Sequence, residues 1–277
     1  MSDAPPSFLP QLLAHGRPLV MGVLNITPDS FSDGGRFLDP AKALAHAERM
    51  ITQGADIIDV GAESTRPYGG AVPVSAEDEV ARLTPIFGNV VGLGVPVSID
   101  TLKSEVAAWA LDQGAAMIND VWGLQSDPGL AKLAAERGVP VVVMHNRDKA
   151  EPAIDIVADI DTFLHRSLAI AERAGIAREQ IVLDPGIGFG KTPGQSMAAI
   201  AQLARFKSFG LPLLVGASRK RFISAVTPSE PDQRLGGSLA AHLLAVENGA
   251  AIVRVHDVAE TVQALSVAAA IRGHRER

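Results

Sequence analysis

Cysteine is missing from this chain of 277 residues, and aromatic residues make up only 4% of it. Without thiols the chain can form neither disulfides nor cysteine-ligated metal sites, and it has no thiolate nucleophile. So few aromatic rings argue against a surface that stacks nucleic-acid bases. A formal net charge of −6 argues against binding through phosphate contacts. We therefore expect no nucleic-acid partner, although a local cationic pocket for a small anion remains open.

Long hydrophobic runs are also missing, since no apolar stretch approaches the ~18 residues that a membrane-spanning helix needs. The N-terminal stretch MSDAPPSFLPQLLAHGRP lacks the basic region and apolar core of a signal peptide. Hydrophobic residues nevertheless make up 47% of the chain, enough for a sizeable core. These features predict a cytoplasmic globular protein with no membrane partner.

Short apolar runs alternate with segments of helical periodicity. The runs cover residues 18–26, 55–61, 95–100, 116–121, 139–145, 181–187, 211–217 and 251–257. Helices are expected at 40–53, 77–91, 103–113, 128–137, 154–175, 194–208, 234–248 and 258–272. Nearly continuous apolar strands are typical of parallel sheets buried on both faces. Eight strand–helix units predict a single-domain α/β fold, the (β/α)8 TIM barrel.

A doubly wound open sheet is the alternative architecture, and the count of eight favours the barrel. We expect the barrel to span residues 18–272. Residues 1–17 are then an N-terminal extension and residues 273–277 a C-terminal tail.

Polar side chains that a core cannot explain stand at almost every predicted strand end. They are Asn25, Asp59, Asp100, Asn119, Asp120, His145, Asp184, Ser218, Arg219, Lys220, Arg254, His256 and Asp257. A single Asp in such a place is more often a helix cap or turn former. In a barrel, however, all the C-terminal strand ends meet at one mouth, where active sites are built. Because burying so many unpaired polar groups would be costly, their convergence predicts a polar binding site.

These polar residues fall into two chemical groups. One group offers carboxylate acceptors, an amide and a donor: Asp100, Asn119, Asp184 and Lys220. It suits a flat heterocycle with an amino-pyrimidinone edge. The other group offers positive charge for phosphate or carboxylate: Arg66, Arg219, Lys220, Arg254 and His256. Asn25 adds a neutral oxygen suited to Mg²⁺ that is otherwise held by water and phosphate oxygens.

The stretch DPGIGFGKT (184–192) has two interpretations. Its glycines either only permit a tight exit from the strand, or Phe189 and Lys191 form pocket walls; the spacing is not that of a Walker phosphate loop. His145 and His256 each lack a second His at i+2 or i+4, which argues against a metal site. His256 shares its face with Arg254 at i−2 and is better suited to an anion.

Eight motifs appear in order at the predicted strand ends: LNITPDSFSDGG, GAESTRP, SID, IND, VMH, LDPGIGFGKT, GASRK and RVHDV. Together they closely resemble the dihydropteroate synthase family of folate biosynthesis, over residues 18–272. The resemblance implies a (β/α)8 barrel that is a homodimer and requires Mg²⁺. It also implies a transferase that condenses (7,8-dihydropterin-6-yl)methyl diphosphate with 4-aminobenzoate to give 7,8-dihydropteroate and diphosphate.

The resemblance further implies roles for individual residues. The pterin is expected to contact Asp100, Asn119, Met144, Asp184, Phe189, Lys220 and Arg254. The expected catalytic set is Asn25, Thr65, Arg66, Lys220, Arg254 and His256, with Asn25 also the Mg²⁺ ligand. The 4-aminobenzoate site and the two loops at 25–37 and 63–75 contribute Phe31, Asp33, Thr65, Pro67 and Arg221. Both loops are expected to close over the site.

Two positions depart from the family pattern. Arg221 stands where a Ser is common, and Gln195–Ser196 stand where His-Asn is common. For the mechanism, loss of diphosphate to a delocalised pterin cation, followed by attack of the neutral aniline nitrogen, requires no strong base. Positive charge at the mouth would stabilise the departing diphosphate.

Other pterin-binding proteins are alternatives to this interpretation. A methyltetrahydrofolate-binding methyltransferase barrel shares the pterin pocket, but TPDSFSDGG, STRP and SRK argue against it. A non-catalytic pterin-binding paralogue should lack part of the diphosphate or loop set, which is complete here. A sulfonamide-insensitive synthase, with the same reaction and altered loops, stays open.

Overall fold

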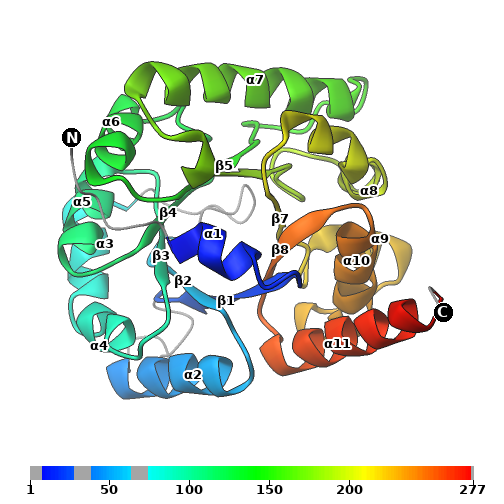
Figure 1. Cartoon of the computed structure of the whole chain (residues 1–277), viewed down its shortest axis with the longest axis horizontal. Helices are drawn as coiled ribbons and strands as arrows, with labels where there is room; N and C mark the ends of the chain where they lie inside the picture. The colour runs from blue at the N-terminus through cyan, green and yellow to red at the C-terminus, as the bar shows by residue number, and fades with distance from the viewer. Residues whose placement is uncertain (1–7, 28–38, 64–73, 276–277) are drawn as a thin grey trace.

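The computed structural model describes residues 8–27, 39–63 and 74–275. Eight parallel strands close into one barrel in chain order. They are β1 (Leu19–Asn25), β2 (Ile57–Gly61), β3 (Val97–Asp100), β4 (Met117–Asp120), β5 (Val141–Met144), β6 (Ile181–Asp184), β7 (Leu213–Val215) and β8 (Ala250–Val255). Figure 1 looks into this barrel, with the helices arranged around it. The predicted TIM barrel is therefore confirmed.

Helices follow the strands around the outside of the barrel. They are α2 (Pro40–Thr52), α3 (Ala76–Leu83), α4 (Phe87–Val91), α5 (Ser104–Asp112), α6 (Pro128–Arg137), α7 (Ile156–Ala174), α8 (Pro193–Ala201), α9 (Arg221–Val226), α10 (Leu235–Glu247) and α11 (Val258–Arg275). Three 3-10 segments complete the described elements: Arg178–Gln180, Leu203–Phe209 and Pro231–Gln233. No helix of the described chain is both long and apolar enough to cross a membrane.

Two of the predicted helical segments differ from the structure, and one short helix lies outside all of them. The helix expected at 77–91 is two helices, α3 and α4, because Pro85 lacks the N–H that a continuous helix needs. The one expected at 194–208 ends as an α-helix at Ala201 and continues as the 3-10 segment Leu203–Phe209. The short helix α9 lies between the segments expected to be helical at 194–208 and 234–248. These differences lie outside the barrel wall and leave the strand order unchanged.

The first helix, α1 (Phe8–Leu13), lies in the segment expected to be an extension. Figure 1 shows it crossing in front of the centre of the barrel. Its Leu9 is 0% exposed and belongs to the inner core of the barrel, packed with the early residues of the strands, including Leu19, Ile57 and Ile252. A second, larger core lies between the strands and the helices. The N-terminal end of the barrel is thus covered, and the polar strand ends lie at the opposite end, the barrel mouth.

Candidate active site

A guanidinium shared by two carboxylates forms the centre of the barrel mouth. Arg254 of β8 donates from Nε to Asp59 Oδ2 at 2.6 Å and from Nη2 to Asp100 Oδ2 at 2.8 Å. Asn119 donates from Nδ2 to the same Asp59 oxygen at 3.0 Å. Asp59, Asp100 and Asn119 are all buried. Side chains that are up to 195 residues apart in the sequence therefore meet in one cluster.

Strand register explains why these side chains meet. Asp100 of β3 pairs with Gly61 of β2 on one side and with Asn119 of β4 on the other. Asp59 lies two residues before Gly61 on the same strand, so its side chain points to the same face one layer deeper. Gly61 has no side chain, which leaves room beside Asp100: an added Cβ would lie 3.3 Å from the Asp100 Cβ.

Burial dominates the electrostatics of this cluster. It raises the pKa of Asp100 to about 7, although the Arg254 charge opposes the shift, while Asp59 adds to it. Burial alone would lower the pKa of Arg254, but the attraction of Asp59 and Asp100 outweighs it and raises the pKa above its ordinary value. One oxygen of each carboxylate, Oδ1 of Asp59 and of Asp100, is buried and has no hydrogen-bond partner among the described residues. Two buried acceptors therefore remain for a ligand.

A second group lies across the mouth, at the end of β6. Asp184 pairs in register with Met144 of β5, and both side chains are buried. Its Oδ1 accepts from the backbone N–H of Gly186 at 2.7 Å. Lys220 donates to the carbonyl of Ile187, and its Nζ lies 4.5 Å from the centroid of the Phe189 ring. Burial raises the pKa of Asp184, and the nearby Lys220 charge opposes this.

The predicted anion-binding residues are found in different settings. The backbone N–H of His256 donates to Ser218 Oγ at 3.2 Å, and its Nδ1 lies 3.0 Å from the same oxygen. Asn25 ends β1 and is half-buried. Arg219 differs from expectation, because its guanidinium forms an ion pair with Asp257, with Nε 3.0 Å from Oδ2. Its charge is largely compensated there and is less suited to a substrate.

The positions that depart from the family pattern have clear structural settings. Gln195 completes the capping box of α8 with Thr192, and its Nε2 donates to the Glu151 carbonyl at 2.7 Å. Arg221 begins α9 and is exposed at the rim of a pocket of about 440 Å³. This pocket is also lined by Gly188, Lys191, Thr192, Pro193, Ser196, Phe222, Ser224, Ala225 and Ala150. Gln195 therefore has a local structural role, whereas Arg221 stands beside open space.

Five of the predicted site residues lie outside the described residues: Phe31, Asp33, Thr65, Arg66 and Pro67. The described residues on either side of the second segment are joined, since Val74 N–H donates to Glu63 Oε1 at 3.1 Å. Lys103 in turn pairs with Glu63 and, at 2.8 Å, with the buried Glu79. Glu63 and Val74, the described residues that flank this segment, are therefore held together near the end of β2.

Two features of the site were not assigned from the sequence. Asp59 was noted as a strand residue but was given no role, although a carboxylate inside an apolar strand was a usable signal. Lys191 and His145 were considered separately, yet Lys191 Nζ lies 2.6 Å from His145 Nδ1. No local pattern indicates this pair, because its members are 46 residues apart.

A magnesium ion would find few protein ligands here. The described residues hold no group of three or more His, Asp or Glu side chains able to bind a metal. Asn25, at the end of β1, offers one hard amide oxygen. That donor set fits Mg²⁺ only if substrate phosphate oxygens and water complete the coordination, which is common for this ion.

Comparisons with known proteins agree with this geometry. A family profile described as pterin binding enzyme matches residues 21–256. The dihydropteroate synthase of Bacillus subtilis is 48% identical over 241 residues, which cover 87% of this chain and 84% of the relative.

Two solved structures of Xanthomonas albilineans dihydropteroate synthase are similar throughout. One, with 4-aminobenzoic acid, is 46% identical with a TM-score of 0.88 and covers 92% of this chain and 93% of the other. The second, with 7,8-dihydropteroate, is 44% identical with a TM-score of 0.84 and covers 92% and 94%. The chain therefore belongs to the dihydropteroate synthase family.

Proposed function

We propose that this chain condenses (7,8-dihydropterin-6-yl)methyl diphosphate with 4-aminobenzoate at the barrel mouth, releasing 7,8-dihydropteroate and diphosphate. The observation that carries the proposal is the set of buried carboxylates at the strand ends, Asp59, Asp100 and Asp184, arranged around Arg254. Carboxylates in this setting suit the exocyclic amine and ring N–H groups of a pterin. The Xanthomonas relative solved with 4-aminobenzoic acid supports the second substrate.

The pterin lies, in this proposal, between the two halves of the mouth. Asp100 accepts through Oδ1, which has no partner among the described residues, and Asn119 contributes its amide. Asp184 and Lys220 bind the opposite edge, and Met144 and Phe189 form apolar walls next to them. Arg254, already fixed by two carboxylates, lies between these groups, so the pocket is organised before the substrate arrives.

The reaction begins with cleavage of the bond between the methylene carbon and the diphosphate oxygen. The bonding electrons leave with the diphosphate, and the positive charge spreads over the dihydropterin ring. Asp100 and Asp184 stabilise that cation electrostatically because they are desolvated and close to the ring. Arg254 and His256 face the departing diphosphate, together with Arg66, which stays a prediction.

Bond formation follows on the same carbon. The neutral amine of 4-aminobenzoate donates its lone pair to the methylene carbon and then loses a proton to water or to the released diphosphate. No protein base is required, since the attacking nitrogen is uncharged. Thr65, Pro67, Phe31 and Asp33 are proposed to enclose this substrate, with Arg221 as a cation available to its carboxylate.

Magnesium is the proposed cofactor. Asn25 would hold the ion through its side-chain oxygen, and the ion would neutralise charge on the diphosphate. Removal of Mg²⁺ by a chelator should then abolish turnover, with activity restored on adding the ion back.

The test is an assay of diphosphate release with product identified by mass. Wild-type protein should release diphosphate only while dihydropteroate forms. Arg254→Ala should lower kcat/KM by about 10²–10³-fold, the scale expected for loss of an electrostatic stabiliser, and Arg254→Lys should lower it less. Lys132→Ala, at an exposed position on α6, is the control. Pterin binding without product would overturn the proposed reaction, and unchanged turnover in Arg254→Ala would overturn the role of Arg254.

The chain is further proposed to form a homodimer through α10 and α11, which pack against each other. Leu244, Val267 and Ile271 on these helices are 54%, 54% and 55% exposed. Apolar side chains this large are candidates for a protein interface. Light scattering should give twice the chain mass for wild type and a monomer for Leu244→Glu/Ile271→Glu, and a wild-type monomer would contradict this part.

A further inference from the structure

A lysine of the loop that joins β6 to α8 is buried. Lys191 is only 5% exposed. Its Nζ lies 2.8 Å from the carbonyl oxygen of Gly186, 3.1 Å from that of Phe189 and 2.6 Å from His145 Nδ1. Three acceptors therefore surround one amino group, and two of them are backbone carbonyls of the loop that carries Phe189.

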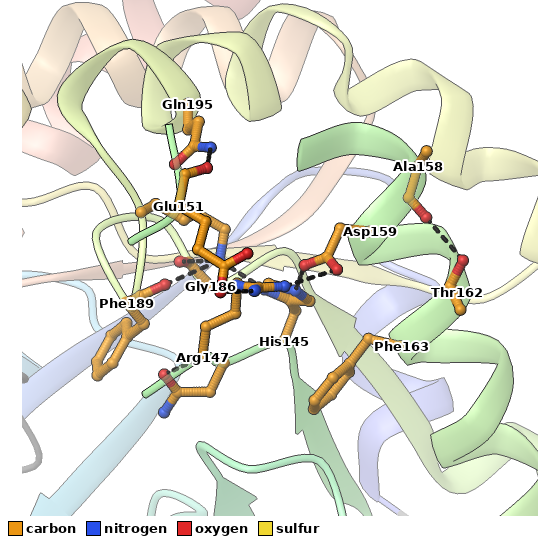
Figure 2. Close-up of polar contacts among 12 residues, drawn as sticks. His145, Arg147, Glu151, Ala158, Asp159, Thr162, Phe163, Gly186, Phe189 and Gln195 are labelled. Atoms are coloured by element: carbon orange, nitrogen blue, oxygen red, sulfur yellow. Dashed lines mark hydrogen bonds and ion pairs between the residues drawn. The ribbon is translucent and has the colours of Figure 1, made fainter. Parts of the chain in front are cut away.

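The contact of Asp159 with His145 Nε2 determines which ring nitrogen of His145 carries the hydrogen. His145 Nε2 lies 2.9 Å from Asp159 Oδ2, and Arg147 donates to the other oxygen of Asp159 at 2.7 Å. Figure 2 shows His145 between Asp159 and the loop with Gly186 and Phe189. Partial burial opposes ionisation of Asp159, but hydrogen bonds from Arg147 and His145 outweigh it and lower its pKa. Because an ionised carboxylate only accepts, Nε2 must carry the hydrogen and Nδ1 must accept from Lys191.

The charge state of Lys191 follows from its partners. An ammonium has three N–H donors, and this site offers three acceptors, whereas a neutral amine would leave one acceptor unused. Burial lowers the pKa of Lys191 well below its ordinary value, and the nearby Asp184 charge opposes that shift. Burial and the Lys191 charge lower the pKa of His145 to about 3, so the imidazole is neutral near pH 7.

The same loop is pressed against the segment that follows β5. Gly186 has φ +66°, and a Cβ there would lie 1.8 Å from the His145 carbonyl oxygen. At Gly190, with φ +52°, a Cβ would lie 2.3 Å from the Arg147 carbonyl oxygen. Such close contact leaves the loop position dependent on how residues 145–147 and Lys191 are held.

We propose that Lys191, oriented by His145, is a positioning residue for the pterin pocket. Its ammonium holds the carbonyls at Gly186 and Phe189, which bracket the turn. Since Gly186 N–H also binds the Asp184 carboxylate, the ammonium sets where both Asp184 and Phe189 stand. Lys220 holds Ile187 in the middle of the same turn from the side of the mouth. This inference rests on the proposed function, because it assigns pterin binding to Asp184 and Phe189.

The first experiment compares Lys191→Met with wild type and with the exposed control Lys132→Met. Lys191→Met should raise the Kd for the dihydropterin diphosphate by about 10–100-fold, the scale of losing a charged hydrogen-bond donor, while the KM for 4-aminobenzoate at saturating pterin stays within about 2-fold. His145→Phe should show the same selective loss. The double variant should be no worse than Lys191→Met, because His145 acts on the pocket only through Lys191.

A loss of pterin affinity with an unchanged KM for 4-aminobenzoate would show that Lys191 and His145 position the pocket, because general destabilisation of the fold would affect both substrates. If Lys191→Met and His145→Phe melt earlier but bind pterin as wild type does, the inference is overturned and the proposed function stands. If wild type itself binds no pterin, the proposed function fails first.

A spectroscopic test reads the tautomer in the wild-type protein itself. In ¹⁵N-histidine spectra of the wild type, His145 should be the neutral tautomer with hydrogen on Nε2, identified by its loss in His145→Asn. An Nδ1-protonated His145 would overturn the inference. Asp159→Asn, at the surface end of the network, should weaken pterin binding by about 3-fold, as expected for a partly exposed contact, and no change in this variant would also contradict it.

Discussion

Asp59 is the residue on which the other polar groups of the mouth depend. One of its oxygens accepts from both Arg254 and Asn119. Without that carboxylate the guanidinium would keep Asp100 as its one hydrogen-bonded carboxylate among the described residues, and Asn119 would lose its hydrogen bond to Asp59. Asp59 is buried one layer below Asp100, and its hydrogen bonds to Arg254 and Asn119 position both of those side chains.

The variant Asp59→Asn tests this dependence. We expect kcat/KM for the pterin substrate to fall by about 10–100-fold, because one charge-assisted hydrogen bond to Arg254 is lost. The KM for 4-aminobenzoate should change little. Steady-state kinetics with each substrate varied in turn measures the split, and Asp78→Asn, at an exposed position of α3, is the matched control. An equal rise in both KM values would argue for a general disturbance.

The ionisation of Asp100 gives a prediction about pH. Burial raises the pKa of Asp100 from 3.8 to about 7, and Arg254 opposes the shift. Because pterin N–H groups need the ionised carboxylate, affinity should rise as pH passes from 6 to 8. In the unfolded chain the Asp100 carboxyl has its ordinary pKa of 3.8. Its contribution to the free energy of unfolding should therefore fall as the pH rises through about 7, its pKa in the folded protein.

Fluorescence titration with a hydroxymethylpterin measures this affinity. This ligand lacks the diphosphate group, whose own ionisation would change with pH. Asp100→Asn should bind weakly at every pH in that range. If the variant kept the wild-type pH profile, the titrating group would have to lie elsewhere, with Asp120, whose pKa burial raises to about 6, as the next candidate.

The loop between β6 and α8 packs closely against the backbone that follows β5 at Gly186 and Gly190. Gly186→Ala would combine a positive φ with a Cβ 1.8 Å from a backbone oxygen. Gly175, after α7, has φ +85° but no neighbour within 4 Å of such a Cβ among the described residues. Gly175→Ala should therefore cost only about 1–2 kcal/mol, the cost of the left-handed conformation. Gly186→Ala should cost clearly more, measured by urea unfolding, and equal costs would contradict the close approach.

Elements also show how far sequence reasoning reaches. The strands and the meeting of Asp100, Asn119 and Arg254 followed from apolar runs and from the geometry of a closed barrel. The break at Pro85 was available from the sequence as well, since proline interrupts a helix. Contacts such as Lys191 with His145 were not, because they depend on how two loops fold against each other. Asp59 lies between these cases: its strand was predicted, but its partners required the register.

In the whole molecule, the two ends of the barrel differ in the residues they carry. The polar strand ends meet at one end, whereas α1 covers the other through Leu9. In barrels of this kind residues at the N-terminal face serve stability, and residues at the C-terminal face serve catalysis. Every candidate site residue within the described chain follows this division, since each stands at or beyond the C-terminal part of a strand.

The variant Leu9→Ala tests the division at its covered end. Removing a fully buried leucine should lower the free energy of unfolding by about 2–5 kcal/mol, from lost burial and the cavity left behind. Gln11→Ala, on the exposed side of α1, should change it by less than about 0.5 kcal/mol. Both variants should keep the wild-type KM for pterin and 4-aminobenzoate below their melting temperatures, because α1 touches the inner core and not the mouth. A rise in KM for Leu9→Ala with unchanged stability would mean that this end of the barrel controls the site.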